Sequence, residues 1–340
     1  MSGIGVTGVG AVSPAGWGAG CLFEAVAAGR AAAVEVLERE HAGVRVATPV
    51  RRVPAAGGAE AVPRHPRLRR ASPLARFLAA AAVEALGAER RAAVAAGELR
   101  LGVVCVLMNG CVNFSNRFYG EVLADPALAS PIVFPETVFN APSSHLSALL
   151  GSTGPNDTLL GDGAAFFPGL ELAAGWLERG EADACLVVAG EEIDWLSAEA
   201  LRLYARAGVA AEGAGALLLE PGAAAVNLLE IAGPVGVGGP GGRAGAMRQV
   251  RAALAAAADG ATLLVDGRTG VPRWDRPETD AWAGWSGPRW SPRTLLGEAM
   301  GAAAALQAVA AAEAVRRGLA PRTVVTASGG NQQAAGCLLG

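Results

Sequence analysis

The stretch Thr158-Leu159-Leu160-Gly161-Asp162-Gly163-Ala164-Ala165 decides how this chain is interpreted. A short apolar run that enters a glycine-rich turn and then alanines indicates a strand passing sharply into a helix. A side chain at such a turn stands at a helix N-terminus, where unpaired amides and the helix dipole favour negative charge. Here that position is Gly163, which has no side chain.

Around this turn, short β-branched runs alternate with alanine-rich stretches, as in α/β proteins. Several expected strands are apolar throughout, which is typical of a sheet covered on both faces. The expected strands are Gly3–Val9, Leu101–Leu107, Asp183–Ala189, Gly215–Glu220, Ala261–Asp266 and Val324–Ser328. The expected helices are Leu22–Ala28, Pro73–Leu86, Ser144–Leu150, Phe167–Arg179, Ser197–Arg206, Met247–Ala258 and Leu296–Arg317.

Three segments rich in proline and glycine are expected to be irregular. Glu38–Val62 is interpreted as an excursion, Pro221–Gly242 as a crossover or a seam between halves, and Pro272–Pro292 as a long loop. The last segment holds four of the seven tryptophans, Trp274, Trp282, Trp285 and Trp290. They either pack under the loop or line a pocket or partner surface.

Composition excludes several classes of protein. The chain has 340 residues, of which 52% are hydrophobic and 17% charged, so it can bury a large core. A net charge of -3 gives no general basic field for nucleic acid or for an anionic membrane. The segment Arg64–Arg70 is locally basic, and it is either a solvated surface loop or a face for an acidic carrier protein.

The cysteines and the apolar segments indicate a cytoplasmic protein. The five cysteines have no CxxC spacing, and their odd number favours free thiols over disulfides or a zinc site. The N-terminus lacks the charged and apolar regions of a signal peptide, and no apolar run is long enough to span a bilayer.

Several motifs occur in the order found in β-ketoacyl synthases, and the chain resembles that family. They are Val6–Pro14, Phe134–His145, the turn Gly154-Pro155-Asn156, Glu212–Leu217, Gly297 with Gly301–Ala303, and Gly329-Gly330-Asn331. The resemblance implies a thiolase-like fold, in which two similar α/β halves form a five-layer αβαβα sandwich. We expect the halves to be residues 1–220, with insertions, and 221–340. The second half is shortened near its C-terminus, which puts the family's last hairpin in doubt.

The same resemblance identifies four vacated catalytic positions. The family's nucleophilic cysteine corresponds to Gly163 and its first histidine to Gly267. Its second histidine corresponds to Glu298 and its lysine to Arg293. The chain contains no lysine, and no Ser-His-Asp or Cys-His pattern replaces these groups. No metal site and no cofactor are expected.

Charged residues remain near the vacated positions, namely Asp162, Arg268, Arg293 and Glu298. One interpretation is structural: a carboxylate and a guanidinium fill the old pocket as an ion pair. The alternative is a new active site in which Asp162 and Glu298 act as acid and base. Phe166 is expected either to block the acyl site or to pack in the core.

The function favoured by the resemblance is that of a chain length factor of type II polyketide or aryl-polyene systems. Such a subunit would be inactive itself, would pair with an active ketosynthase and would shape its acyl tunnel. The tunnel residues expected are Val133, which would project into the partner, with Phe134 and Phe118. For Val133 an ordinary core or interface role is the alternative.

Other functions remain open. The chain could be a stand-alone cyclase, dehydratase or acyl-transfer enzyme on the same scaffold. It could also be a pseudoenzyme that only organises an assembly. The expected partners are an active ketosynthase or a second copy of the chain, and an acyl carrier protein, with neither nucleic acid nor membrane.

Overall fold

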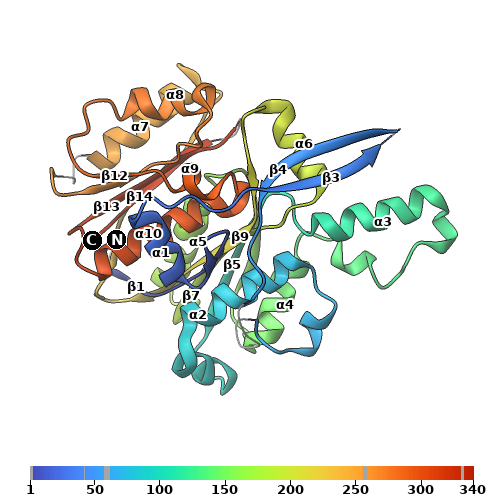
Figure 1. The fold of residues 1–340 in the computed structure, drawn as a ribbon. Coiled ribbons are helices and arrows are strands. Elements are labelled where there is room, and N and C mark those ends of the chain that lie inside the picture. Colours follow the sequence, from blue (N-terminus) through green and yellow to red (C-terminus); the bar gives the residue numbers. More distant parts are fainter. Residues whose placement is uncertain (1–2, 42, 57–61, 256–258, 331–332) are drawn as a thin grey trace.

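The computed structural model describes residues 3–41, 43–56, 62–255, 259–330 and 333–340. Its largest sheet has strands in the order β12-β11-β13-β14-β10-β1-β9-β7-β5-β6, and the β2 strand (Gly16–Trp17) pairs beside β1. A second sheet is small and contains β3, β4 and β8. Figure 1 shows helices on both faces of the large sheet.

The five strands at the β6 end of the large sheet form one half. In sheet order they are β6 (Asn156–Leu160), β5 (Leu101–Leu107), β7 (Ala184–Glu191), β9 (Gly213–Pro221) and β1 (Ile4–Ser13). Strand β5 is parallel to β6 and β7, whereas β9 is antiparallel to both β7 and β1. Every residue of β5 and β7 is buried, as expected for strands covered on both faces.

The second half repeats this pattern strand for strand. Its order is β12 (Arg289–Trp290), β11 (Leu263–Val265), β13 (Thr323–Ser328), β14 (Gln333–Leu339) and β10 (Asn227–Gly236). Strand β11 is parallel to β12 and β13, and β14 is antiparallel to β13 and β10. The two halves are joined through β1 and β10, where Ile4 pairs with Leu228 and Gly5 pairs with Asn227. The repeat confirms the two similar halves, while the division at residues 220 and 221 stays a prediction.

The helices form three layers around the two halves of the large sheet. The middle layer contains α5 (Phe166–Glu178) and α10 (Ala303–Arg316), each of which contacts strands of both halves, together with α1 (Ala19–Ala27). Nearly all of α10 is buried, and its small alanines let both halves of the large sheet approach the helix closely. The outer layers contain α2 (Pro73–Ala95) with α4 (Ala141–Leu150), and α7 (Gly242–Ala255) with α8 (Pro272–Ala281).

Two of the segments expected to be irregular contain strands. Most of Glu38–Val62 belongs to a hairpin of β3 (Glu35–His41) and β4 (Val44–Arg51), which turns at Gly43 with a φ of +76°. Alternating Val44, Val46, Thr48 and Val50 give the period of two that the prolines and glycines obscured. Strand β4 pairs in parallel with the two-residue strand β8 (Ala210–Ala211) on its other edge. Pro221–Gly242 contains strand β10.

Two further elements differ from expectation around the second half's catalytic segment. Pro272–Pro292 is not a loop, because Pro272 opens helix α8 and β12 follows. The long helix expected at Leu296–Arg317 begins later than expected: Leu296 is the last residue of α9 (Pro292–Leu296), Gly297 follows with a φ of +91°, and α10 begins at Ala303. The last hairpin, which was in doubt, is present as β13 and β14. The end of the expected helix Met247–Ala258 lies outside the described residues.

An arm formed by residues 112–139 projects from the first half (Figure 1). It consists of α3 (Val112–Ala124) and the short 3-10 helices η2 (Pro126–Leu128) and η3 (Phe134–Glu136). Helix α6 (Trp195–Tyr204) packs near its base. None of these elements was expected in the arm, because its polar and apolar residues lack a clear period.

Candidate functional site: a filled ketosynthase-like pocket

The strand-to-helix elbow lies where the sequence places it. Strand β6 ends at Leu160, and helix α5 begins at Phe166. Asp162 is buried and stabilises the turn before the helix: its Oδ1 accepts the Ala164 amide at 3.3 Å, and its carbonyl accepts the Ala165 amide at 2.9 Å. The carboxylate also lies against Gly329, where an added Cβ would come within 1.6 Å of Oδ2. The expected glycine-rich closing turn therefore meets the elbow.

The space above Gly163 is occupied by Arg293. A Cβ built on Gly163 would lie 3.4 Å from Nη2 and 3.7 Å from Nη1 of Arg293, and 3.3 Å from the Met300 carbonyl oxygen. A longer side chain at this position would extend into the guanidinium. The position of the nucleophile therefore carries no side chain, and Arg293 occupies the space above it.

Arg293 is held by a buried ion pair with Glu298, and each side chain is 6% exposed. Both Nε and Nη2 of Arg293 donate to Oε2 of Glu298, with Nε at 3.1 Å. Oε1 of Glu298 accepts the Met300 amide at 2.8 Å. Burial opposes the charge of Arg293, but Glu298 outweighs this effect and the pKa of the guanidinium is raised. This arrangement supports the structural interpretation of the pair over a free acid or base.

The segment that carries this pair is held by residues that are distant from it in the sequence. Gly297 follows α9, and the Glu298 amide donates to the Val209 carbonyl at 2.8 Å. The Ala211 amide in turn donates to the Glu298 carbonyl at 2.9 Å. Arg51, at the end of β4, donates through Nη1 to the Thr294 carbonyl at 3.1 Å and to the Leu295 carbonyl at 2.5 Å, and so caps α9. The small sheet therefore positions the pair.

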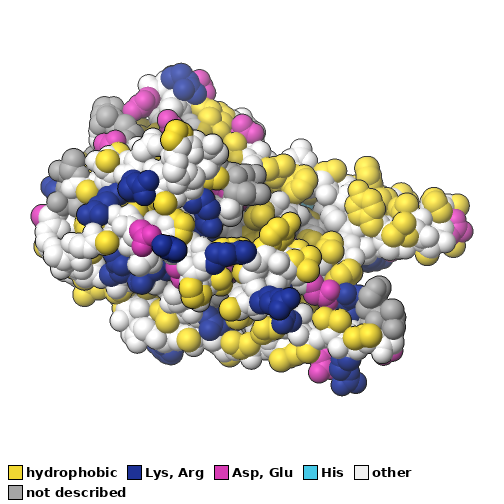
Figure 2. All heavy atoms as spheres, turned by 90° about the horizontal axis from the view of Figure 1, so that it is seen from above, with side chains coloured by type: hydrophobic (Ala, Val, Ile, Leu, Met, Phe, Trp, Pro, Cys, Tyr) yellow, Lys and Arg dark blue, Asp and Glu magenta, His cyan; other side chains and the backbone are white. Residues whose placement is uncertain are grey.

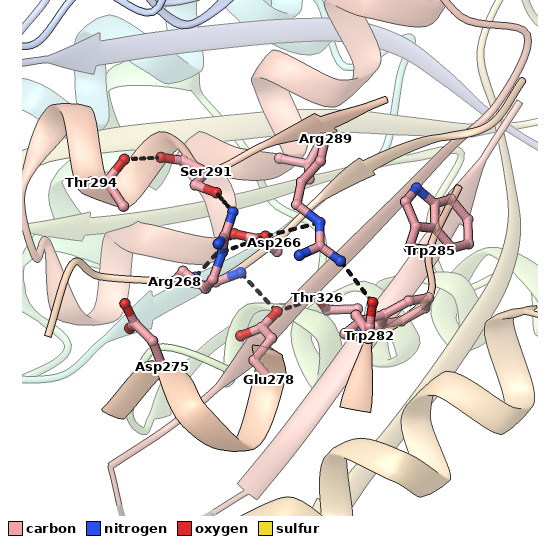
Figure 3. Close-up of polar contacts among 12 residues, drawn as sticks. Asp266, Arg268, Asp275, Glu278, Trp282, Trp285, Arg289, Ser291, Thr294 and Thr326 are labelled. Carbon is pink, nitrogen blue, oxygen red and sulfur yellow. Dashed lines mark hydrogen bonds and ion pairs between the residues drawn. The ribbon is translucent and has the colours of Figure 1, made fainter. Parts of the chain in front are cut away.

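Gly267, the first histidine's position, is covered by a carboxylate that the sequence analysis missed. Glu278 of α8 accepts the Gly267 amide at 2.8 Å and the Thr326 hydroxyl, both through Oε1 (Figure 3). A Cβ on Gly267 would lie 2.8 Å from Oε2 of Glu278. Burial, together with Asp266, raises the pKa of Glu278 to about 7. Glu278 was missed because its helix was interpreted as a loop.

Arg268 does not join the pair above Gly163. Its Nε lies 2.8 Å from Oδ2 of buried Asp266, and its Nη2 donates to the Ser291 hydroxyl at 2.8 Å (Figure 3). Arg289 approaches the same Asp266 oxygen at 3.6 Å. The charged residues near the vacated positions thus form linked ion pairs, each serving to neutralise a buried charge.

A second missed carboxylate, Glu191, lies at the end of β7. Its Oε2 accepts the Gly301 amide at 3.3 Å, and burial raises its pKa to about 8. The signal available in the sequence was the pair Glu191-Glu192 directly after an all-apolar strand. Glu192 is committed to structure, because it accepts the amides of Leu74 and Asn113.

No thiol replaces the missing nucleophile in the part of the chain that the structure describes. Cys111 is buried, and its sulfur accepts a hydrogen bond from the Ser72 hydroxyl at 3.2 Å. Burial raises the pKa of Cys111 to about 12, and it also raises the pKa of Cys105. These thiols are therefore protonated near neutral pH.

The expected tunnel residues occupy three different environments. Phe166 is fully buried in the main core beside Phe167, which supports its packing role. Val133 is 5% exposed and lies in the interior of this chain, and its expected tunnel role stays a prediction. Phe134 is 54% exposed, and its ring lies 5.4 Å from that of Phe118.

The described residues form neither a metal-binding cluster nor a membrane-spanning helix. Within the described ranges, no cluster of three or more histidine, cysteine, aspartate or glutamate side chains could hold a metal ion. Among the helices of those same ranges, none is both long and apolar enough to traverse a bilayer.

Comparison with known structures gives full-length matches. The ishigamide ketosynthase/chain length factor matches with 20% identity, a TM-score of 0.81 and 99% of each chain covered. The ketosynthase ApeO in complex with its chain length factor ApeC, from Xenorhabdus doucetiae, matches with 16% identity and a TM-score of 0.79, covering 100% of this chain and 98% of that one. AntDE:AntF, a type II acyl carrier protein in complex with its ketosynthase, matches with 17% identity, a TM-score of 0.81 and 99% of each chain covered.

These identities are low, so the likeness shows the thiolase-like fold. No curated protein matches the sequence. The family model for the N-terminal domain of β-ketoacyl synthases matches residues 1–210, which is more than half of the chain. The chain belongs to the β-ketoacyl synthase family.

Proposed function

We propose that this chain is a catalytically inactive ketosynthase-like subunit, similar to a chain length factor. It pairs with an active ketosynthase in type II polyketide or polyene biosynthesis and shapes the acyl tunnel of that partner. The observation that carries this proposal is the filled pocket. Arg293 covers the position of the nucleophile and Glu278 covers that of the first histidine, so an acyl group has neither an attachment point nor space there.

The alternative of a stand-alone enzyme gains no support from the two residues expected to perform it. Glu298 has both oxygens engaged, one by Arg293 and the other by the Met300 amide. Asp162 accepts the Ala164 amide in the turn before helix α5 and is packed against Gly329. A general acid or base must reach a substrate proton, and both carboxylates are turned into the protein instead.

The surface supports association with another chain of the same fold. Exposed large apolar side chains are concentrated on the arm: Tyr119, Leu123, Leu128, Ile132, Phe134, Val138 and Phe139. Figure 2 shows hydrophobic side chains gathered over the projecting arm. This apolar surface continues through Met108 to Leu160 on β6, the last strand of the sheet, whose outer edge is unpaired among the described residues. An apolar patch beside an open strand edge is typical of a subunit interface.

A basic face supports docking of an acidic carrier protein. The short 3-10 helix η1 (Pro66–Arg69) is anchored by buried Leu68. Around it Arg64, Arg67, Arg69 and Arg70 are exposed. Such clustered guanidinium groups attract an acidic partner and increase its rate of association.

The proposal is tested by co-expression with a type II ketosynthase that retains its catalytic cysteine. We expect the two chains to co-purify as a 1:1 complex that yields carrier-bound product, while this chain alone acquires no acyl group by intact-mass analysis. Acylation of this chain, or product formation by it alone, would overturn the proposal.

Restoring the nucleophile provides a second test. In the Gly163→Cys variant the new side chain meets Arg293, and both histidine positions stay replaced, so we expect no decarboxylation of a malonyl carrier thioester. The exposed native thiol is removed in a Cys21→Ser background, which makes any adduct attributable to residue 163. Measurable decarboxylation by the variant would show that only the sulfur was missing.

A further inference from the structure

A cavity of about 220 Å³ opens beside helix α1, and none of the residues that line it belongs to the filled pocket or to the arm. Pockets that hold drug-sized molecules measure about 300–1,000 Å³, so this cavity suits a smaller compound. Much of its lining can contact a short aliphatic group. The apolar lining residues are Pro14, Ala15, Ala25, Ala31 and Ala32.

The walls of the cavity are held by backbone hydrogen bonds. Helix α1 ends before Gly29, whose φ is +63°, and the Arg30 amide donates back to the Ala25 carbonyl at 2.8 Å. Two residues later, the Ala32 amide donates to the Leu295 carbonyl of α9 at 2.9 Å. The segment after the helix is therefore fastened at both ends, and the cavity exists before a ligand binds. A preformed site costs a small ligand less ordering than a mobile one does.

Two opposite charges border this cavity. Glu24 lies on α1 one turn after Cys21, on the same side of the helix, and Arg30 follows the helix. Both charged side chains are exposed. Neither forms an ion pair, with the other or with a third group, in the part of the chain that the structure describes. A hydrogen-bond acceptor and a donor are thus both available to a single ligand in the cavity.

We propose that this cavity binds a free aliphatic α-amino acid. Arg30 binds the carboxylate through its fork of N–H groups, and Glu24 accepts hydrogen bonds from the ammonium group. The aliphatic side chain of the ligand packs against the apolar lining. Exposed ion pairs contribute little individually, so we expect a dissociation constant on the order of 1 mM. The cavity lies within one chain, so binding needs neither a ketosynthase nor a carrier protein.

The native thiol at the cavity provides the test. Cys21 is exposed, whereas the other four cysteines are buried. Labelling of the full-length chain with N-ethylmaleimide, followed by mass spectrometry of its peptides, therefore reports on this site. We expect L-leucine at about 10 mM to slow the labelling of Cys21 about tenfold, since about ten times the dissociation constant leaves about one tenth of the sites free.

Two analogues of leucine test the need for both charges. Isocaproate lacks the amino group of leucine, and isoamylamine lacks its carboxylate, so each should protect Cys21 far less. An unchanged labelling rate with L-leucine, or equal protection by either analogue, would overturn the proposal.

Variants of the two charged residues locate the binding. In Arg30→Gln and in Glu24→Gln, each compared with itself without ligand, we expect L-leucine to give no protection. Arg91→Gln is the matched control and keeps the protection, because this residue is also exposed but lies on α2 and does not line the cavity. Protection that persists in both cavity variants, or that is lost equally in the control, would contradict the assignment.

Hydrogen exchange gives a second readout, which needs no thiol. A ligand held between α1 and the segment that follows it stabilises the hydrogen bond from the Ala32 amide to Leu295. We therefore expect L-leucine to slow exchange of residues 30–32 in the wild type but not in Arg30→Gln. Exchange that saturating L-leucine leaves unchanged in the wild type would reject the site.

Discussion

At the scale of single residues, the vacated site shows that two substitutions by glycine do not leave a hole. The guanidinium of Arg293 and the carboxylate of Glu278 occupy the space above Gly163 and Gly267. Sequence comparison identifies the lost groups, but it does not show which side chains move into their place. Arg293 was predictable, because it stands at a family position, whereas Glu278 comes from a helix that was interpreted as a loop.

The buried pair of Arg293 and Glu298 makes a quantitative prediction. Removing one partner strands a charge in a site where each side chain is 6% exposed. We expect Arg293→Met or Glu298→Gln alone to lower the free energy of unfolding by about 3–5 kcal/mol, and the double variant to lose less than the sum. Urea denaturation measures all four proteins.

The exposed pair of Arg100 and Asp183 is the matched control, since its side chains are 54% and 40% exposed. Substituting either of its residues should lower the free energy of unfolding far less than a change at the buried pair, because solvent screens an exposed ion pair. Additive losses at Arg293 and Glu298 would mean that the two side chains do not act as a pair.

Glu278 predicts a pH dependence of stability. Burial raises its folded pKa to about 7 from an ordinary value of 4.5. A raised carboxyl pKa means that the folded state holds the proton more tightly than the unfolded state does. The contribution of protonated Glu278 to the free energy of unfolding is therefore fully present below pH 4.5 and is lost as the pH rises through 7. In Glu278→Gln the amide oxygen can still accept the Gly267 and Thr326 bonds, but it does not titrate.

We therefore expect the variant to gain stability relative to the wild type, by up to about 3 kcal/mol, between pH 4.5 and 8. Chemical denaturation at a series of pH values measures the difference. A difference that is constant with pH would show that Glu278 keeps an ordinary pKa.

At the scale of elements, the sequence predicted the fully buried strands best. The strands now called β5, β7 and β13 were placed within one or two residues, because their unbroken apolar runs leave little ambiguity. Failures occurred where proline or glycine interrupted a regular element. Pro272 opens helix α8 rather than a loop, and Gly297 follows α9, so that the alanine-rich helix begins only at Ala303. The period of a sequence does not show whether such a residue breaks, caps or opens an element.

Gly297 also lies where the small sheet contacts the segment of Arg293 and Glu298, and this contact yields a prediction. Its φ is +91°, and an added Cβ would lie 2.9 Å from both the Ala211 Cβ and the Val209 carbonyl oxygen. Gly297→Ala should therefore cost at least about 2 kcal/mol, because strain and clash act together.

Gly87 separates these two effects. Its φ of +67° and ψ of 178° resemble those of Gly297, whose ψ is -178°, but an added Cβ there meets nothing within 4 Å. Gly87→Ala should therefore cost only the strain, and less than Gly297→Ala. Thermal unfolding of both variants measures the difference, and equal losses would show that the contact with β8 is not a constraint.

At the scale of the whole molecule, the two halves have kept the same strand order while their surfaces have diverged in use. The first half carries the arm and the free edge of β6, whereas the second half ends in the two-residue strand β12. A subunit whose pocket is filled can still contribute through the half that meets a partner. The apolar side chains of the arm are a cost to an isolated chain, because they are exposed to water unless another surface covers them.

This argument predicts where association with the ketosynthase can be broken. Leu123 and Leu128 are 85% and 79% exposed on the arm, so Leu123→Glu or Leu128→Glu leaves the folded chain almost unchanged but places a charge in the proposed interface. We expect each variant to weaken the complex by at least about tenfold, which corresponds to 1.4 kcal/mol, in sedimentation or surface-binding measurements. Leu319→Glu is the control, because this residue is also exposed, at 58%, but follows α10 in the second half. A complex that tolerates both arm variants as well as it tolerates the control would place the interface elsewhere on the molecule.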